Sequence, residues 1–441
     1  MYEAAVSGAI PETAVQHAVT ALDLPPASPV RIIALGKAAQ AMATGALSAL
    51  AATGREPASG VVVGPEPAPA PHPSLVALAG DHPVPAQASL AAANAIGDAV
   101  AAVRAGDDVL ALISGGGTSL AAAPVLAGSD FTQEDLGRLY ELLLASGADV
   151  VAMNAVRKRF ARWLGGRLGA ALAPARVHCL IVSDVLGDDL ASISSGPCVP
   201  DPLTARDIRA RLERARLWPG LATYPPETEA TLTRVRAYLD AVAAGAAPET
   251  PKPNDPAFTG ITTRIVVSNA HAVQAAAARA RAAGIDEVTV IDQPLVGEAA
   301  ICGVRLASDL IARRRRARGP HITRCVVWGG ETTVTLGPAP GLGGRNQELA
   351  LAAARSLADA GDHAQGIMVL AAGTDGRDGP TDAAGAVVDG LTWHAVAANG
   401  RDPAADLAAH DAYRALAAAR ALLHVGHTGT NVMDVVIGLI M

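Results

Sequence analysis

Residues 108–119 read DVLALISGGGTS, and the fold prediction depends on this stretch. A short, nearly continuous apolar run (108–113) leads directly into a loop of three glycines and three hydroxyl side chains (114–119). Such a run, ended by a glycine-rich turn, is typical of a parallel strand that is buried on both faces and followed by a helix.

The same alternation of short apolar runs and longer Ala- and Leu-rich stretches extends along the chain. The expected strands are 30–35, 60–63, 108–113, 177–183, 264–268, 287–291, 324–328 and 366–371. The expected helices are 38–52, 86–104, 132–144, 270–283, 297–316, 346–359 and 403–423. This pattern predicts an α/β fold of mainly parallel or mixed sheets flanked by helices.

The chain has 441 residues, which suggests two or three domains at roughly 150 residues each. A Pro- and Ala-rich stretch, AAGAAPETPKPNDPAFT (243–259), separates two regions of α/β pattern. Its prolines disfavour a continuous helix or a central strand. We therefore expect an N-terminal domain over 1–245, a linker over 246–260 and a C-terminal domain over 261–441.

Composition limits the partners and the compartment. A formal net charge of −7 provides no basic surface for nucleic acid, and the apolar runs are interrupted before membrane-spanning length. The four cysteines form no C-x-x-C pair, and the N-terminus lacks a signal-peptide pattern. We expect a cytoplasmic protein with small-molecule substrates; a homodimer is a hypothesis that the composition leaves open.

Residues suited to anion binding follow the first and third expected strands, at the ends where open α/β sheets bind ligands. Lys37 opens a helix, where a cation is unfavourable unless an anion is bound nearby. The loop after 108–113 can form a nest of backbone N–H donors for phosphate, although it is not a Walker A motif. Its residues are Ser114, Gly115, Gly116, Gly117, Thr118 and Ser119.

Charged residues follow other expected strands. Asp184 suits Mg²⁺ binding or the orientation of a hydroxyl, whereas Asp189 either binds metal or caps a short helix. Glu331 and Asp375 lie among glycines, and Arg345 stands before a helix, where its guanidinium can bind a carboxylate or phosphate. These residues predict an α/β enzyme that handles phosphate or another anion.

Ten segments, in this order, resemble the glycerate 2-kinase family with a MOFRL-type C-terminal domain, some members of which are labelled hydroxypyruvate reductases. They are ALGKAAQAMA (34–43), GDHPVP (80–85), ISGGGTSL (113–120), MNAVRKRF (153–160), GGRLG (165–169), VSDVLGDDLASISSGPCVPDP (182–202), VVWGGETTVTL (326–336), GGRNQELAL (343–351), AAGTDGRDGPTDAAGA (371–386) and TGTNVMD (428–434). The resemblance covers nearly the whole chain.

This resemblance implies a Rossmann-like N-terminal domain, a MOFRL-type C-terminal domain and an active site in the cleft between them. It also implies ATP, Mg²⁺ and D-glycerate as ligands, with 2-phosphoglycerate as product. By this resemblance, Lys37 stabilises the transferring phosphoryl group, Asp184 is a catalytic or metal-organising acid, and Arg345 holds the glycerate carboxylate or a phosphate. Glu331 and Asp375 would be second-rank polar groups, with 114–119 as part of the anion cradle.

The chain departs from the family pattern at Leu164 (usually Lys), Cys198 (Thr), His427 (Pro) and Met433 (Asn). If the missing lysine binds nucleotide, Lys158 or Arg159 would have to replace it. These departures leave a kinase for a related hydroxy acid as an alternative.

Two other functions remain open. An NAD(P)-dependent hydroxypyruvate reductase should carry G-x-G-x-x-G after its first strand, but the first strand here is followed by GKAAQA (36–41). A non-catalytic small-molecule binding protein could share the fold. The acid and cations at the strand ends favour an enzyme over such a binding protein.

Overall fold

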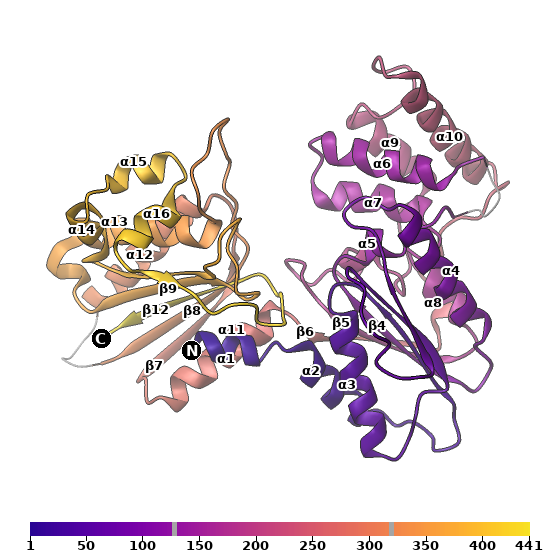
Figure 1. The fold of residues 1–441 in the computed structure, drawn as a ribbon, viewed down its shortest axis with the longest axis horizontal. Helices are drawn as coiled ribbons and strands as arrows, with labels where there is room; N and C mark the ends of the chain where they lie inside the picture. The colour runs from indigo at the N-terminus through magenta and orange to yellow at the C-terminus, as the bar shows by residue number, and fades with distance from the viewer. Residues whose placement is uncertain (126–129, 317–321) are drawn as a thin grey trace. The chain divides into compact units, whose positions relative to one another are not determined.

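The computed structural model describes residues 1–125, 130–316 and 322–441, and it divides the chain into two compact units. The first, here named the parallel-sheet unit, spans Pro11–Val266. The second, the mixed-sheet unit, combines Met1–Ile10 with Val267–Met441. Each contains a six-stranded sheet with flanking helices, so the predicted two-domain α/β class is confirmed (Figure 1).

The sheet of the parallel-sheet unit has the strand order β3-β2-β1-β4-β5-β6. Its strands are β1 (Val30–Leu35), β2 (Ser59–Gly64), β3 (Leu75–Ala79), β4 (Asp108–Ser114), β5 (Arg176–Val182) and β6 (Ile261–Val267). The pairings from β3 through β5 are parallel. The order reverses between β1 and β4, and doubly wound sheets bind ligands at the carboxyl ends of strands at such a switch point.

Helices cover both faces of this sheet. On one face lie α2 (Pro11–Thr20) and α3 (Ala39–Ala52), and on the other lie α4 (Gln87–Ala101) and α8 (Arg167–Leu172) (Figure 1). Every residue of β4 is buried, as its continuous apolar run predicts.

A helical layer adjoins the sheet, with its own apolar core around Tyr140 and Phe160. Its helices are α6 (Gln133–Ala145), α7 (Val150–Phe160), α9 (Ala205–Arg214) and α10 (Pro226–Ala243). The short helices α5 (Gly117–Leu120) and η1 (Ile193–Ser195) contribute to the core of the sheet, and η2 (Pro256–Phe258) contacts α8. A capping box begins α6, where Thr132 and Asp135 each accept the other's backbone N–H; a second begins α9. Among the described helices, none is long and apolar enough to cross a membrane.

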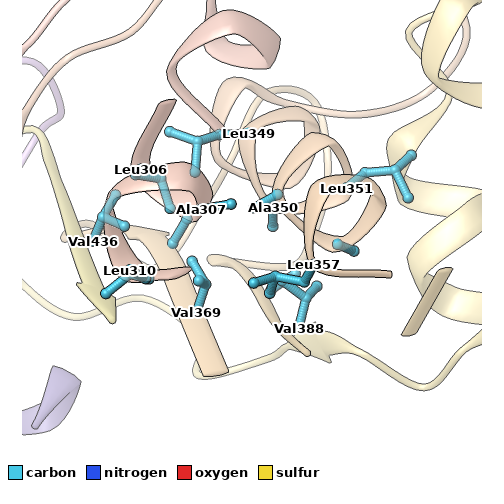
Figure 2. Packing of buried hydrophobic residues seen from close by; sticks show 14 of the residues in the cluster. Leu306, Ala307, Leu310, Leu349, Ala350, Leu351, Leu357, Val369, Val388 and Val436 are labelled. Carbon is cyan, nitrogen blue, oxygen red and sulfur yellow. The ribbon is translucent and has the colours of Figure 1, made fainter. Parts of the chain in front are cut away.

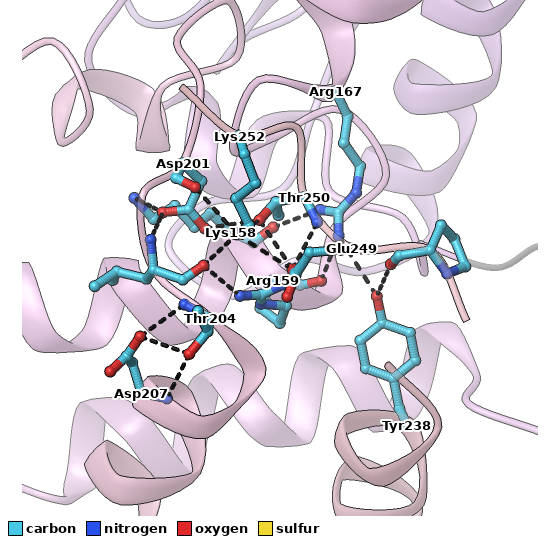
Figure 3. A network of polar contacts seen from close by, with 12 residues as sticks. Lys158, Arg159, Arg167, Asp201, Thr204, Asp207, Tyr238, Glu249, Thr250 and Lys252 are labelled. Carbon is cyan, nitrogen blue, oxygen red and sulfur yellow. Dashed lines mark hydrogen bonds and ion pairs between the residues drawn. The ribbon is translucent and has the colours of Figure 1, made fainter. Parts of the chain in front are cut away.

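The stretch expected to be a linker, 246–260, is bound to the parallel-sheet unit by polar contacts (Figure 3). Thr250 Oγ1 donates to Asp201 Oδ2 at 3.1 Å, and Lys252 Nζ donates to the Asp201 carbonyl at 3.1 Å. The chain then enters β6, at the edge of the same sheet. The structure therefore divides the chain after 266, because contacts across some fifty residues hold the proline-rich stretch in place.

The sheet of the mixed-sheet unit has the strand order β11-β10-β9-β12-β8-β7. Its elements are α1 (Tyr2–Ser7), α11 (Asn269–Ala282), β7 (Glu287–Leu295), α12 (Ala299–Arg315), β8 (Arg324–Gly330), α13 (Arg345–Ala360), η3 (Gly361–Ala364), β9 (Ile367–Gly373), β10 (Gly385–Asp389), α14 (Thr392–Ala398), α15 (Pro403–Ala408), α16 (Ala412–Ala418), β11 (Leu422–Leu423) and β12 (Asp434–Ile440). Only β7 and β8 pair in parallel among its described pairs.

The central strand β12 was not among the expected strands. It runs antiparallel between β8 and β9, so its first residue, Asp434, lies opposite Gly330 and Gly373 at the carboxyl ends of both neighbours. Helices α12 and α13 cover one face of the sheet, and α1 and α11 lie on the other (Figure 1). Figure 2 shows the core under α12 and α13, where Leu310 and Val436 pack together.

The single helix expected over 403–423 was wrong. The segment forms α15 and α16, interrupted at His410, which has a left-handed φ of 56°. Beside the break, the Asp411 carboxylate accepts from Arg401 Nη2 at 2.9 Å and from the Leu342 backbone N–H at 2.9 Å. These long-range bonds stabilise the interruption, and an Ala-rich sequence pattern cannot reveal them.

Candidate active site

In the parallel-sheet unit, the loops after β1 and β4 are hydrogen-bonded to each other at the switch point. The Lys37 N–H donates to the Gly115 carbonyl at 2.8 Å, and the Ala38 N–H donates to Ser114 Oγ at 2.9 Å. Gly36 makes this approach possible: its φ is +126°, and a Cβ there would lie 2.2 Å from the Ser114 carbonyl oxygen. The structure thus brings together Lys37 and the loop 114–119, two parts of the predicted site.

Asp184, directly after β5, lies against the same glycine loop. A Cβ on Gly115 would lie 1.7 Å from Asp184 Oδ2, and one on Gly116 would lie 3.0 Å from Lys37 Cγ. Burial raises the pKa of the Asp184 carboxyl, and the positive charge of Lys37 opposes that rise. The Lys37 side chain is exposed, so a ligand in solution can reach it.

Two serines outside the predicted site, Ser194 and Ser195, also contact the glycine loop. The Gly117 N–H donates to Ser194 Oγ at 3.0 Å, and Thr118 Oγ1 and Ser195 Oγ lie 2.9 Å apart. Both serines adopt left-handed φ values, 47° and 59°, which cost about 1–3 kcal/mol each at non-glycine residues. The N–H groups of Gly117 and Ser119, both within the expected anion cradle, are therefore already bonded within the protein.

Asp189 has the contacts of a capping residue. Its carboxylate accepts from Ser192 Oγ at 2.5 Å and from the Ala191 N–H at 3.3 Å, just before η1. Metal binding by Asp189 and Asp184 stays a prediction. Within the described ranges, no group of three His, Cys, Asp or Glu side chains could hold a metal ion by itself.

Lys158 and Arg159, the suggested replacements for the missing lysine, serve an internal network (Figure 3). Lys158 Nζ lies 3.1 Å from Asp201 Oδ1, and Arg159 pairs with Glu249. Both cations are buried, and Leu164 is fully buried in the apolar core of the helical layer. Since both side chains pair with acids of their own, neither is a free cation for a nucleotide.

In the mixed-sheet unit, Arg345 begins α13 and binds two acids. Its Nε and Nη2 contact the two oxygens of Asp434 at 2.6 and 2.9 Å, and its Nη1 lies 2.9 Å from Glu331 Oε1. Burial alone would lower the pKa of Arg345, but the hydrogen bonds and charge of Asp434 outweigh it and raise that pKa. The Arg345 side chain is one-third exposed, at 34%.

Asp434 and Asp378 are buried acids that the predicted site did not include. Burial raises the pKa of Asp434, Arg345 opposes this rise, and the charge of Asp375 adds to it. Asp378 accepts from the Asn346 N–H at 3.1 Å and the Gln347 N–H at 2.8 Å, at the N-terminus of α13. An internal carboxylate therefore occupies the N-terminus of α13, where the helix dipole favours negative charge. Asp434 ends the motif TGTNVMD (428–434), but the sequence analysis did not predict β12, and only the pairing of that strand places Asp434 beside Arg345.

We expect Asp378 to make the stability of the mixed-sheet unit depend on pH. Burial raises its pKa to about 6, so the folded state binds this proton more tightly than the unfolded state does. Its contribution to the free energy of unfolding should fall by roughly 2 kcal/mol as pH rises from 4 to 6. Asp378→Asn should remove this dependence in denaturant titrations, and the exposed-site control Asp362→Asn should keep it. A wild-type slope in Asp378→Asn would contradict the assignment.

The remaining departures from the family pattern, at positions 427, 433 and 198, lie in three different structural settings. His427 is exposed, and its Nδ1 accepts from the Gly429 N–H of its own loop. Met433 has a left-handed φ of 66°, a conformation that Asn adopts more easily. A hydrogen bond with Cys179, together with burial, raises the pKa of Cys198.

Comparison with known proteins gives consistent matches along the chain. Residues 1–231 match a domain of unknown function (DUF4147), and residues 324–434 match the MOFRL family. A D-glycerate 2-kinase of Thermotoga maritima is 35% identical over 99% of this chain and 96% of its own. A putative hydroxypyruvate reductase of Agrobacterium vitis is 37% identical over 99% of this chain and 92% of its own. The crystal structure of a Thermotoga maritima glycerate kinase superposes with a TM-score of 0.83 at 33% identity, covering 100% of this chain and 97% of that chain.

Proposed function

This chain belongs to the MOFRL-containing glycerate kinase family, and on that premise we propose that it transfers the γ-phosphoryl group of ATP to D-glycerate. The acceptor is the 2-hydroxyl, and the product is 2-phosphoglycerate. The family is the premise for the substrate, whereas the chemistry of phosphate handling is supported by the residues themselves.

One arrangement carries the proposal: Lys37 and Asp184 contact the glycine loop 114–119 at the switch point between β1 and β4. Phosphoryl transfer depends mainly on positioned positive charge and N–H donors around the transferring group. In the proposal, the Lys37 ammonium stabilises charge on the phosphoryl oxygens. Unbonded N–H groups of the loop bind phosphate, and Asp184 orients the reacting groups.

The residues fit Mg²⁺ in the form that kinases use. Mg²⁺ is usually held by one or two carboxylates plus substrate phosphates, so a complete protein cage is not required. Asp184 is a carboxylate beside the proposed phosphate loop, and it would hold the ion. When bound, Mg²⁺ supplies positive charge to the phosphates.

Arg345 is proposed to hold the glycerate carboxylate or a phosphate. Asp434 and Glu331 each take N–H donors of the guanidinium, but Nη1 and Nη2 each keep a second N–H that can meet an anion. Glu331 and Asp375 are proposed as supporting groups that orient Arg345 and the bound ligand. In this arrangement the acids hold the guanidinium in place, so it loses little freedom when the ligand binds.

The proposal is tested by coupled ATP turnover of the purified protein with D-glycerate, L-glycerate, glycolate and lactate. We expect Mg²⁺-dependent ADP formation with D-glycerate, and phosphorus NMR should identify 2-phosphoglycerate as the product. Turnover with another hydroxy acid only would replace the acceptor and keep the kinase. The absence of turnover with all four acceptors would contradict the proposal.

A hydroxypyruvate reductase is the second candidate, because a relative named as a putative hydroxypyruvate reductase aligns with nearly the whole chain. One observation counts against it: the loop after β1 reads GKAAQA (36–41) and lacks the second and third glycines of the G-x-G-x-x-G pattern of dinucleotide-binding loops. Loss of NADH or NADPH absorbance with hydroxypyruvate would favour this candidate.

We also propose a reducing, cytoplasmic location, which the four cysteines support because all of them are free and buried.

A further inference from the structure

Arg157, on α7, is a buried cation without an acidic partner in the described part of the chain. It is 8% exposed, and its Nε and Nη2 atoms are buried without hydrogen-bond partners. Its Nη1 makes only a long bond, 3.4 Å, to Asn154 Oδ1. The next two residues of the helix, Lys158 and Arg159, each pair with an acid. A charge buried without a partner is unfavourable, so the position of Arg157 requires an explanation.

Arg157 is connected to the glycine loop through one aromatic side chain. Its guanidinium carbon lies 4.8 Å from the centre of the Tyr140 ring, and Tyr140 Oη donates to the Thr118 carbonyl at 2.9 Å. The pKa of His82 is lowered, first by partial burial and then by the positive charges of Lys37 and Arg157. Because both charges act on one imidazole, Lys37 and Arg157 lie in the same region of the parallel-sheet unit.

A purely structural role would leave most of this arrangement unexplained. Stacking on Tyr140 is a favourable cation–π contact, and a cation near the C-terminus of α7 suits the helix dipole. Neither contact supplies an acceptor for the buried Nε and Nη2 protons. The described protein residues therefore leave these donors without an acceptor, and a bound anion would both accept from them and offset the charge.

We propose that Arg157 is a phosphate-binding residue, which together with Lys37 holds the triphosphate of ATP beside the loop 114–119. The identity of the nucleotide rests on the proposed function, whereas the need for an anion rests on the unpaired guanidinium. Phosphate oxygens are the acceptors that a guanidinium binds best. The bound triphosphate supplies the negative charge that pairs with the Arg157 guanidinium.

Arg157→Met tests this proposal, since methionine keeps much of the side-chain volume and removes the charge. We expect the Kd for ATP, measured by calorimetry without acceptor, to rise about tenfold or more, and the KM for glycerate to change less than twofold. The unfolding midpoint without ligand should stay the same or rise, because an unpaired buried charge has been removed. Arg157→Lys should recover part of the ATP affinity. The control Arg138→Met, on neighbouring α6, should bind ATP normally.

Each contrary result has a definite meaning. Wild-type ATP affinity in Arg157→Met would overturn the proposal, as would a lowered unfolding midpoint with normal affinity. Weakened binding of 2-phosphoglycerate alone would move Arg157 to the acceptor side and also overturn the triphosphate assignment. If the wild type binds neither ATP nor inorganic triphosphate, the proposal is wrong. If ATP binding depends on Arg157 but no glycerate is phosphorylated, the proposed function fails and the role of Arg157 stands.

Discussion

Lys37→Ala is expected to lower kcat/KM for ATP-dependent phosphorylation by about 10²-fold or more, which is the usual effect of removing one charge-stabilising group. The reason is the position of Lys37, directly after β1 and bonded through its backbone to the loop after β4. Its side chain is exposed and makes no ion pair among the described residues, so stability should change little. Initial rates at saturating glycerate and a thermal unfolding curve check both parts.

Asp184→Asn is the companion variant, because the same glycine loop contacts both side chains. We expect a comparable loss of turnover with the fold retained. Arg104→Ala serves as control: this exposed cation of the same unit bonds only to nearby backbone carbonyls and should keep wild-type rates. If Lys37→Ala and Asp184→Asn both keep wild-type turnover, the reaction does not take place at this loop.

Arg345→Ala is expected to reduce both turnover and stability. Turnover should fall about 10²-fold or more if the guanidinium holds the substrate anion. Stability should fall by roughly 3 kcal/mol at neutral pH, the low end for breaking a buried ion pair, since a third of Arg345 is exposed. Burial already raises the pKa of Asp434, and without Arg345 it should rise further. The stability loss should therefore shrink as pH falls and the carboxylate takes up a proton.

The double variant Arg345→Ala/Asp434→Asn separates the two effects. Removing the carboxylate should restore much of the stability, because no unpaired buried charge remains, but turnover should stay low. Rates are compared per folded molecule, with urea unfolding as the measure of stability. Arg355→Ala, an exposed position on the same helix, is the control. If Arg345→Ala turns over normally per folded molecule, Arg345 acts only within the protein and does not hold the substrate.

The part of the candidate site that the sequence could predict depends on parallel topology. Lys37, the loop 114–119 and Asp184 each directly follow a strand that an apolar run identifies. Because parallel strands place their carboxyl ends at one edge, residues far apart in sequence meet there without any further information. The contacts of Lys37 with Gly115 and of Asp184 with that glycine are the result.

The part that could not be predicted depends on antiparallel pairing and on charge pairing. Arg345 meets Asp434 because β12 runs backwards between β8 and β9, and that strand has the same apolar composition as many buried segments. In the motif MNAVRKRF, three adjacent cations are equivalent in sequence. Folding gives Lys158 and Arg159 acidic partners from 201 and 249 and leaves Arg157 without one.

The sequence by itself therefore determined the α/β class, the family and the glycine loop with its lysine and acid. Local apolar runs and glycine positions encode the class and the loop, each within a few neighbouring residues, whereas the family resemblance depends on ten segments in order along the chain. The tertiary structure decided which charges remain available for a ligand. Whether a cation is free depends on acids that lie tens of residues away, and burial then sets how much an unpaired charge costs.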